Sequence, residues 1–365
     1  MAAAALTRAL EAIGGLDFVA PGMKVVIKAN LVAAMHPDSC ATTHPSLVAA
    51  LTKLLVERGA EVTVGDSPGG LFTPALLASN YKATGMHEAE EAGAKLNYNT
   101  ASHTISIDGL KMRRLTYTDY LDDCDAIIDF AKLKSHGMVG MSAAVKNMYG
   151  VIPGLVKPQT HYLYPDVNDF ADMLVDINEH FKPRLSLIDA VECMEGNGPT
   201  AGSPRHVGAV IAARTPYEAD AAAAALIGLD TEGVPTLAAA KRRGLCTNDL
   251  SDIALYGDVD PLAVPDFKKV PRKSLAFLEG SKFGFLSGFI SKTLEQRPQL
   301  KRKKCVACRK CMNICPAKAI TMVKHGKRTY PSIDRSKCIR CFCCQEFCPK
   351  AAMVVHRSII MKILK

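Results

Sequence analysis

The sequence lacks the long hydrophobic runs of a membrane-spanning protein. No uninterrupted apolar stretch reaches about 18 residues, so we expect no transmembrane helix. The first eight residues contain only a short apolar run with no basic segment before it, so we do not expect a secretory leader. These two absences predict a cytoplasmic protein, in a reducing compartment where disulfides are rare.

Acidic residues are scarce near the C-terminus. Residues 301–365 hold 17 Lys and Arg against two acids, a formal +15, whereas residues 1–300 hold 28 basic and 34 acidic residues, a formal −6. Such basic segments often bind nucleic acid or anionic membranes. Metal-bound thiolates in the same segment would bring negative charge that basic neighbours offset, so we consider nucleic acid an unlikely partner. An acidic redox partner protein remains compatible with this charge.

Motifs of the common catalytic classes are also missing. We find no Ser-His-Asp arrangement, no nucleotide-binding loop and no zinc protease motif. The segment Asp66-Ser-Pro-Gly-Gly is rich in glycine, but it is neither a Walker loop nor GxGxxG. By itself it predicts only a turn.

Cysteine, in contrast, is concentrated in two runs near the C-terminus. Each run reads C-x2-C-x2-C-x3-C-P, the pattern by which bacterial two-cluster ferredoxins hold [4Fe-4S] clusters. In that pattern the fourth cysteine of each run binds the cluster of the other run. The prediction is therefore two [4Fe-4S] clusters, one on Cys305, Cys308, Cys311 and Cys348 and the other on Cys338, Cys341, Cys344 and Cys315.

Other uses of these cysteines fit the spacing less well. Zinc sites favour pairs of C-x2-C rather than triplets closed by C-x3-C-P. A [3Fe-4S] site commonly lacks one cysteine, and here all eight are present. Cys343 lies beside the expected ligand Cys344, either as a neighbour without a metal bond or as a substitute ligand after damage. The other four cysteines read as buried thiols.

The rest of the chain alternates between strand and helix patterns. This alternation predicts an α/β body with a mostly parallel sheet and flanking helices over residues 1–295, and a small α+β ferredoxin-like two-cluster domain over residues 296–365. Expected strands are 24–28, 61–65, 95–98, 104–107, 126–131, 184–189, 207–213 and 253–256. Expected helices are 2–13, 45–58, 81–92, 142–150, 167–181, 217–227 and 234–243.

Polar residues gather where the expected strands end. Parallel sheets bind ligands at the carboxyl ends of their strands, so these residues are the candidate site. Lys132, Lys134, His136 and Lys146 fall within fifteen residues and suit an anionic substrate or cofactor, with Lys146 on a helix capped by Ser142. The other candidate ligand-binding residues are Lys28, Asn30, Thr43, His44, Asp66, Ser67, Asn147, Asp189, Glu195 and Asn197. Structural ion pairs between these lysines and carboxylates are the alternative.

An apolar stripe joins the two parts. Within residues 281–300, one helical face is roughly shared by Phe283, Phe285, Leu286, Phe289, Ile290 and Leu294. Docking of the cluster domain onto the body is the favoured interpretation, with membrane contact as the alternative.

Six short motifs together resemble a known family. They are Lys28-Ala-Asn30, Thr43-His44-Pro45, Gly65-Asp66-Ser67-Pro68, Lys132-Leu-Lys134-Ser-His136, Val145-Lys146-Asn147-Met-Tyr-Gly150 and Met194-Glu-Gly-Asn-Gly-Pro199. This series, over roughly residues 20–270, resembles the family catalogued as domain of unknown function 362. Members of that family often carry a C-terminal two-[4Fe-4S] domain. The resemblance implies the architecture and marks the polar segments as the site, but it implies no reaction.

The chain departs from that family in two places. Arg214 stands where the family usually has the first acid of an Asp-Pro-x-Ala-x-Asp stretch, although Asp220 is kept. Ser142 stands where threonine is more usual, which retains the hydroxyl. We therefore assign Arg214 no role from the resemblance.

The combined features predict an iron–sulfur oxidoreductase component. The body would bind an anionic ligand and the tail would deliver electrons. Lys132, Lys134 and Lys146 would neutralise ligand charge, and His136 would donate a proton near neutral pH. Two other classes remain open, namely a non-catalytic electron carrier or docking partner, and a maturation factor that handles metal or a cofactor through Asp66, His136 and Asp189.

Overall fold

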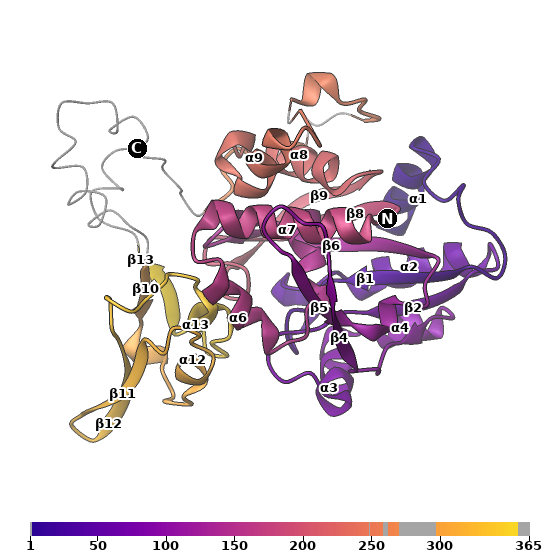
Figure 1. Cartoon of the computed structure of the whole chain (residues 1–365). Helices are drawn as coiled ribbons and strands as arrows, with labels where there is room; N and C mark the ends of the chain where they lie inside the picture. The colour runs from indigo at the N-terminus through magenta and orange to yellow at the C-terminus, as the bar shows by residue number, and fades with distance from the viewer. Residues whose placement is uncertain (1, 248, 258–261, 270–296, 357–365) are drawn as a thin grey trace, which may run out of the picture.

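The body of the protein is a twisted sheet covered by helices on both faces (Figure 1). The computed structural model describes residues 2–247, 249–257, 262–269 and 297–356. The sheet has seven strands in the order β3-β2-β1-β6-β8-β9, with β7 paired to β6. Its strands are β1 (Lys24–Ala29), β2 (Glu61–Gly65), β3 (Lys95–Leu96), β6 (Ala126–His136), β7 (Gly140–Ser142), β8 (Leu185–Glu195) and β9 (Ser203–Ala213).

Five of these strands run parallel. β3, β2, β1, β6 and β8 pair in parallel, whereas β9 and β7 are antiparallel to β8 and β6. A separate hairpin, β4 (Ser102–Ser106) with β5 (Arg114–Thr118), lies beside the sheet (Figure 1). This arrangement confirms the predicted mostly parallel α/β body.

Helices cover both faces because alternate strand residues point to opposite sides. In β1, Val25 and Ile27 enter the core formed with the N-terminal helices, while Val26 faces the core that contains the long helix α7. The helices are α1 (Ala2–Ala12), α2 (Pro45–Val56), α3 (Pro74–Thr84), α4 (His87–Glu91), α5 (Ala144–Asn147), α6 (Val156–Leu163), α7 (Val167–Phe181), α8 (Pro216–Leu226) and α9 (Pro235–Arg242). Among the described helices, none combines the length and apolar character needed to cross a membrane.

The strand order reverses next to β1. The chain passes from β1 outward to β2 and β3, and then returns to place β6 on the other side of β1. Open α/β sheets bind ligands at the carboxyl ends of the strands at such a switch point. The carboxyl ends of β1 and β6 are therefore the expected ligand-binding edge of the body.

The cysteine-rich part forms a small α+β unit built from two similar halves. Each cysteine of the first run recurs 33 positions later, Cys305 as Cys338 and Cys315 as Cys348. Helices α12 (Lys310–Asn313) and α13 (Cys343–Glu346) follow the same offset. Two antiparallel ladders complete the unit: β10 (Arg297–Leu300) with β13 (Met353–His356), and β11 (Ile320–His325) with β12 (Arg328–Ile333).

Several expected elements differ from the structure. β6 continues to His136 and β8 to Glu195, so the polar residues predicted to lie in loops extend the strands. The polar composition of these segments suggested loops. In the structure, however, β7 pairs with the end of β6 and β9 pairs with the end of β8, so both segments are strands. The strand expected at 253–256 does not form: Leu255 and Tyr256 are exposed, and no strand within the described residues pairs with them.

Ser142 does not cap a helix as expected. It lies in β7, and α5 begins at Ala144 without a side-chain cap from its own segment. Asp220 of α8 caps it instead, accepting hydrogen bonds from the backbone nitrogens of Ala144 and Val145 at 2.6 and 3.3 Å. The sequence could not show a cap that comes from 76 residues away. Residues 281–296 of the apolar stripe and the predicted domain boundary lie outside the described residues.

Candidate functional site

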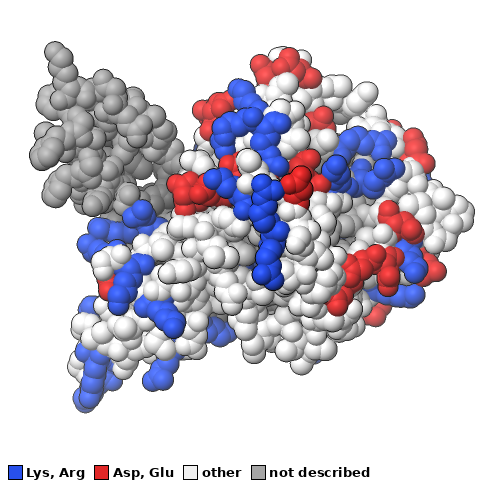
Figure 2. Space-filling model, viewed as in Figure 1, with Lys and Arg blue, Asp and Glu red and all other residues white. Residues whose placement is uncertain are grey.

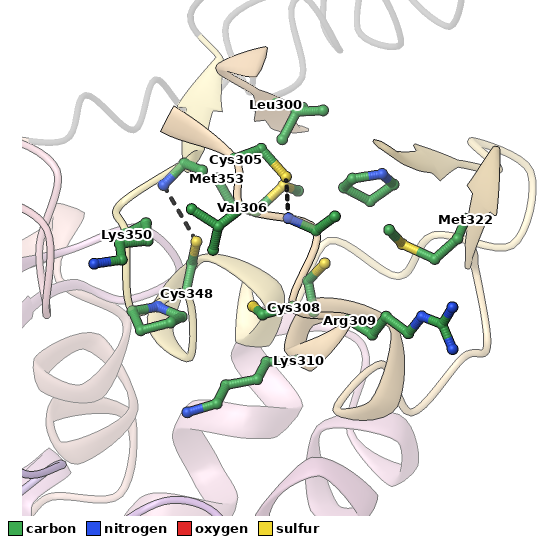
Figure 3. A pocket seen from close by; sticks show the side chains of 15 residues that line it. Leu300, Cys305, Val306, Cys308, Arg309, Lys310, Met322, Cys348, Lys350 and Met353 are labelled. Atoms are coloured by element: carbon green, nitrogen blue, oxygen red, sulfur yellow. Dashed lines mark hydrogen bonds between the residues drawn. The ribbon is translucent and has the colours of Figure 1, made fainter. Parts of the chain in front are cut away.

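The eight cysteines form two groups around two separate cavities. Cys305, Cys308, Cys311 and Cys348 line a cavity with an empty volume of about 370 Å³, open solvent included (Figure 3). A second cavity of about 330 Å³ is lined by Cys315, Cys338, Cys341 and Cys344. Each cavity thus takes three cysteines from one run and the fourth from the other, as the crossed pattern requires.

The backbone around these cavities is suited to metal-bound sulfur. Left-handed residues recur at the 33-residue offset, Ala307 and Arg309 in one half and Arg340 and Phe342 in the other. This conformation turns the loop around the thiols. Backbone nitrogens of Ala307, Ala319 and Ala352 donate to Cys305, Cys315 and Cys348 sulfurs at 3.5, 3.2 and 3.2 Å. Four thiols per cavity, N–H donors to sulfur and no disulfide fit a [4Fe-4S] cluster.

The second cysteine run packs directly against the body. The Gln345 side-chain amide donates to the carbonyls of Asn197 and Gly198 at 2.9 and 3.0 Å, and Thr200 donates to the Glu346 carbonyl at 2.9 Å. The Asn197 side chain accepts from the Val355 nitrogen at 3.2 Å. Asn197 therefore holds the cluster unit rather than a ligand in this structure.

His136 meets this cysteine run at the end of β6. Its Nδ1 accepts backbone hydrogen bonds from Met138 and Val139 at 3.0 and 3.3 Å, which places the ring proton on Nε2. Nε2 lies 2.9 Å from Oε1 of Glu346, two residues after Cys344. The ring therefore connects the body to the loop that carries Cys344.

The surroundings of His136 keep it neutral at pH 7. Burial and the nearby Lys146 lower the pKa of His136 to about 4, although Glu346 acts in the opposite direction. Burial would raise the pKa of Glu346, but His136 and Lys146 hold it below its usual range. A pKa of about 4 does not fit the role of proton donor near neutral pH that the sequence predicted for His136.

Lys28 forms a buried ion pair at the end of β1. Its Nζ lies 2.8 Å from Asp66 Oδ1, and Asp66 also accepts from the Leu31 nitrogen at 2.8 Å. Asn147 donates to the Lys28 carbonyl at 3.1 Å and to Asp129 Oδ1 at 2.6 Å. Burial raises the pKa of Asp129 well above its usual value, against the effect of Lys28.

Lys132 is also paired. Its Nζ lies 2.8 Å from Asp189 Oδ2 across the register between β6 and β8, and both side chains are buried. Asp189 accepts from the His44 nitrogen at 2.9 Å, and Thr43 binds the backbone at Asn30 and Phe130. Lys28 and Lys132 therefore form structural ion pairs, the alternative to ligand binding that the sequence left open.

Lys134 differs because no carboxylate of the described residues pairs with it. Its buried Nζ donates to Asn30 Oδ1 at 2.6 Å and to the Ala41 carbonyl at 2.7 Å. Burial, and then the positive charge of Lys146, lower the pKa of Lys134 well below its usual value. Lys146 is half-buried, and its Nζ lies 5.5 Å from the centre of the Tyr149 ring.

Two residues of α6 join this site that the sequence did not single out. Lys157 donates to the Ser67 carbonyl, and burial lowers its pKa to about 7 while Asp66 opposes the shift. His161 stacks on Phe170 with ring centroids 4.4 Å apart, and burial lowers its pKa to about 3. Their spacing of four residues on a helix was the signal that could have found them.

Glu195 is the predicted residue that lies outside the group. It accepts from the Lys268 backbone and side chain at 3.0 and 2.6 Å, beside the chain segment at 262–269. Burial would raise the pKa of Glu195, but its bonds to Lys268 lower it. These contacts are structural.

A glycine in the loop after β2 makes the docking of the cysteine run testable. A Cβ at Gly69 would lie 2.3 Å from the Phe347 ring, so Gly69→Ala is expected to displace the Gln345–Cys348 segment. Hydrogen exchange of residues 343–356 should rise about tenfold or more, whereas the double variant with Phe347→Ala should recover protection. Unchanged exchange in Gly69→Ala would show that this contact does not hold the unit in place.

Two family models match the chain. Residues 25–225 match "Domain of unknown function (DUF362)" and residues 304–352 match "4Fe-4S dicluster domain". A thylakoid-associated protein of Synechocystis is 33% identical over 249 residues, which cover 66% of this chain and 75% of that protein.

Two solved structures share a more distant likeness. The lactate racemase apoprotein of Thermoanaerobacterium thermosaccharolyticum matches with a TM-score of 0.39 and 13% identity, over 58% of this chain and 52% of that chain. A protein of Thermotoga maritima matches with a TM-score of 0.38 and 15% identity, over 58% and 55%. The matched regions span about half of each structure, and neither carries an argument about function.

Proposed function

This chain belongs to the domain-of-unknown-function 362 family and carries a 4Fe-4S dicluster domain, and from this we propose an iron–sulfur oxidoreductase component with two [4Fe-4S] clusters. Its clusters exchange electrons with an anionic ligand bound at the carboxyl ends of β1 and β6. The observation that carries the proposal is the contact between His136 at the end of β6 and Glu346 in the second cysteine run.

That contact places the cysteine run beside the candidate ligand site. Cys344 and Glu346 are separated by one residue, and Glu346 lies against a side chain of the same strand that supplies Lys134. An electron on the cluster that Cys344 helps to hold would therefore have a short path to the end of β6. The clusters would supply electrons one at a time.

The charges of the site support an anionic ligand. Lys28 and Lys132 are neutralised by Asp66 and Asp189, and burial raises the pKa of Asp129 well above its usual value. Lys134, Lys146 and Lys157 then stand against the single carboxylate of Glu346. An anion would favour the protonated forms of Lys134 and Lys157, whose pKa values burial lowers, because each would gain a charged partner.

The chain's own residues have distinct tasks in this proposal. Lys134 and Lys146 bind and neutralise the ligand, and Asn30 orients the Lys134 amine. Lys157, whose pKa is about 7, is the residue placed to hold or release a proton. His136 positions the cysteine run through the close contact of its Nε2 with Glu346 Oε1.

Anaerobic purification tests both parts of the proposal. We expect about eight irons and eight sulfides per chain, EPR signals of reduced [4Fe-4S] centres, and a small anion retained in native mass spectra. The affinity for that anion should be greatest below pH 7 and should fall as pH rises through 7, because Lys157 loses its proton there. Full iron content with no bound anion, but with a stoichiometric partner protein, would favour the non-catalytic carrier.

A maturation factor receives no support from the site. Asp66, His136 and Asp189 each face a different partner, namely Lys28, Glu346 and Lys132. Within the described residues the grouping suited to a metal ion is His103, Asp119 and Asp122, near the β4–β5 hairpin. The cytoplasmic location and the domain boundary at 295 stay predictions.

A further inference from the structure

The two halves of the cysteine-rich unit differ at equivalent positions. Arg309 and Lys310 in the first half correspond to Phe342 and Cys343 in the second, 33 positions later. Phe342 and Cys343 are buried, and Phe342 packs in the core that contains α7. Arg309 and Lys310 are exposed. The second half is therefore suited to packing against the body, and the first half to exposure to solvent.

The thiols follow the same division. Cys341 and Cys344 are buried at 8% and 7% exposure, whereas Cys308, the equivalent of Cys341, is exposed. The apolar side chain of Val306, between Cys305 and Cys308, is 59% exposed. The group of Cys305, Cys308, Cys311 and Cys348 is thus the one that another protein can approach.

Basic residues surround the cavity of these four cysteines. Arg309, Lys310 and Lys350 line the cavity of these four cysteines, and no acidic residue lines it (Figure 3). Residues 297–356 contain fifteen Lys and Arg but only Asp334 and Glu346 as acids. Because Glu346 faces His136, Asp334 is the one acid exposed on the described part of this unit, and basic side chains are spread over the face seen in Figure 2.

We propose that this exposed face is the docking surface for a small acidic one-electron carrier protein, of the flavodoxin or ferredoxin class. The proposal rests on the proposed function and adds the class of partner and the direction of the path. The carrier would give one electron to the [4Fe-4S] cluster held by Cys305, Cys308, Cys311 and Cys348, and would itself be oxidised by one electron. No proton or chemical group moves in this step, and the buried group on Cys344 then faces the anion site.

Charge complementarity selects this occupant. A basic rim around an exposed apolar Val306 matches an acidic surface with an apolar centre. Electrostatic steering of this kind raises association rates and weakens as salt screens the charges.

The test is stopped-flow reduction of the intact holoprotein by a reduced acidic flavodoxin. The charge-reversed variant carries Arg309→Glu, Lys310→Glu and Lys350→Glu. Its second-order rate constant at low salt should fall about tenfold or more, and the difference from the unaltered protein should disappear at high salt. A matched control carries Lys324→Glu, Lys327→Glu and Arg328→Glu, which make the same change of charge at the β11–β12 hairpin, outside the cavity lining. This control should lose less than about threefold.

A second reductant separates docking from damage to the clusters. Reduction by the methyl viologen radical cation should not slow in the Glu variant. Equal losses with both reductants, or equal losses in the hairpin control, would overturn the proposal. If the Glu variant assembles without iron, the Arg309→Gln, Lys310→Gln, Lys350→Gln variant replaces it, with an expected loss of about threefold.

The remaining outcomes distinguish this proposal from others. An unchanged rate with flavodoxin, together with loss of binding to duplex DNA in the Glu variant, would overturn it in favour of nucleic acid. Anion binding is measured separately on the unaltered holoprotein and on the Glu variant. A failed anion site therefore gives normal flavodoxin reduction, whereas a failed docking surface gives normal anion binding.

Discussion

Replacing Cys315 by alanine is expected to remove the cluster of the second cysteine run, although Cys315 belongs to the first. Cys315 lines the same cavity as Cys338, Cys341 and Cys344. Iron should fall from about eight to about four per chain, because a three-cysteine site holds a [4Fe-4S] cluster poorly. Iron analysis and EPR of the reduced variant provide the measurement, since spin coupling between two reduced clusters should disappear.

Two matched variants control this result. Cys348→Ala should remove the other cluster, because Cys348 lines the cavity of Cys305, Cys308 and Cys311. Cys343→Ala should keep about eight irons, because a residue beside the ligands is replaced without loss of any member of the two groups of four. Loss of the Cys305 group in Cys315→Ala would contradict the crossed arrangement.

The sequence predicted this centre well because its chemistry is local. Three ligands of each group lie within seven residues, and the fourth follows from the repeated spacing. The parallel sheet was equally readable, because buried strands such as 24–28 and 126–131 form apolar runs between helical patterns.

The ion pairs of the body could not be read from the sequence. Lys28 and Asp66 are 38 residues apart, and Lys132 and Asp189 are 57 apart. Only the pairing of β1 with β2 and of β6 with β8 brings each pair together. Composition alone gave no means to separate the paired lysines from Lys134, which has no carboxylate partner.

The sequence also did not predict that the second cysteine run packs beside the candidate ligand site. Gln345 and Glu346 lie between ligand cysteines, where the sequence pattern draws attention only to metal binding. Their contacts reach Asn197 and His136, about 150 and 210 residues earlier in the chain. A contact this distant in sequence has no periodic signal.

Replacing Lys134 by methionine should weaken anion binding strongly and leave both cysteine groups filled. Lys134 is buried and pairs with no carboxylate of the described residues, so its loss removes a donor to the anion but leaves no unpaired acid. Charge-assisted hydrogen bonds contribute about 1.5–3 kcal/mol, so the dissociation constant for phosphate or a dicarboxylate should rise about tenfold or more. Isothermal titration calorimetry on anaerobic holoprotein measures it, with iron content as a check of integrity.

Lys132→Met is the informative contrast, because it leaves Asp189 buried without its partner. That variant should lose about 3–5 kcal/mol of stability, whereas Lys134→Met should be nearly neutral. The pH dependence has a defined sign. Burial lowers the pKa of folded Lys134, so the folded state binds fewer protons than the unfolded chain, and stability rises with pH up to the unfolded value of about 10.4. Lys134→Met should lack this slope, and a variant that keeps both the slope and the anion affinity would assign these properties to another lysine.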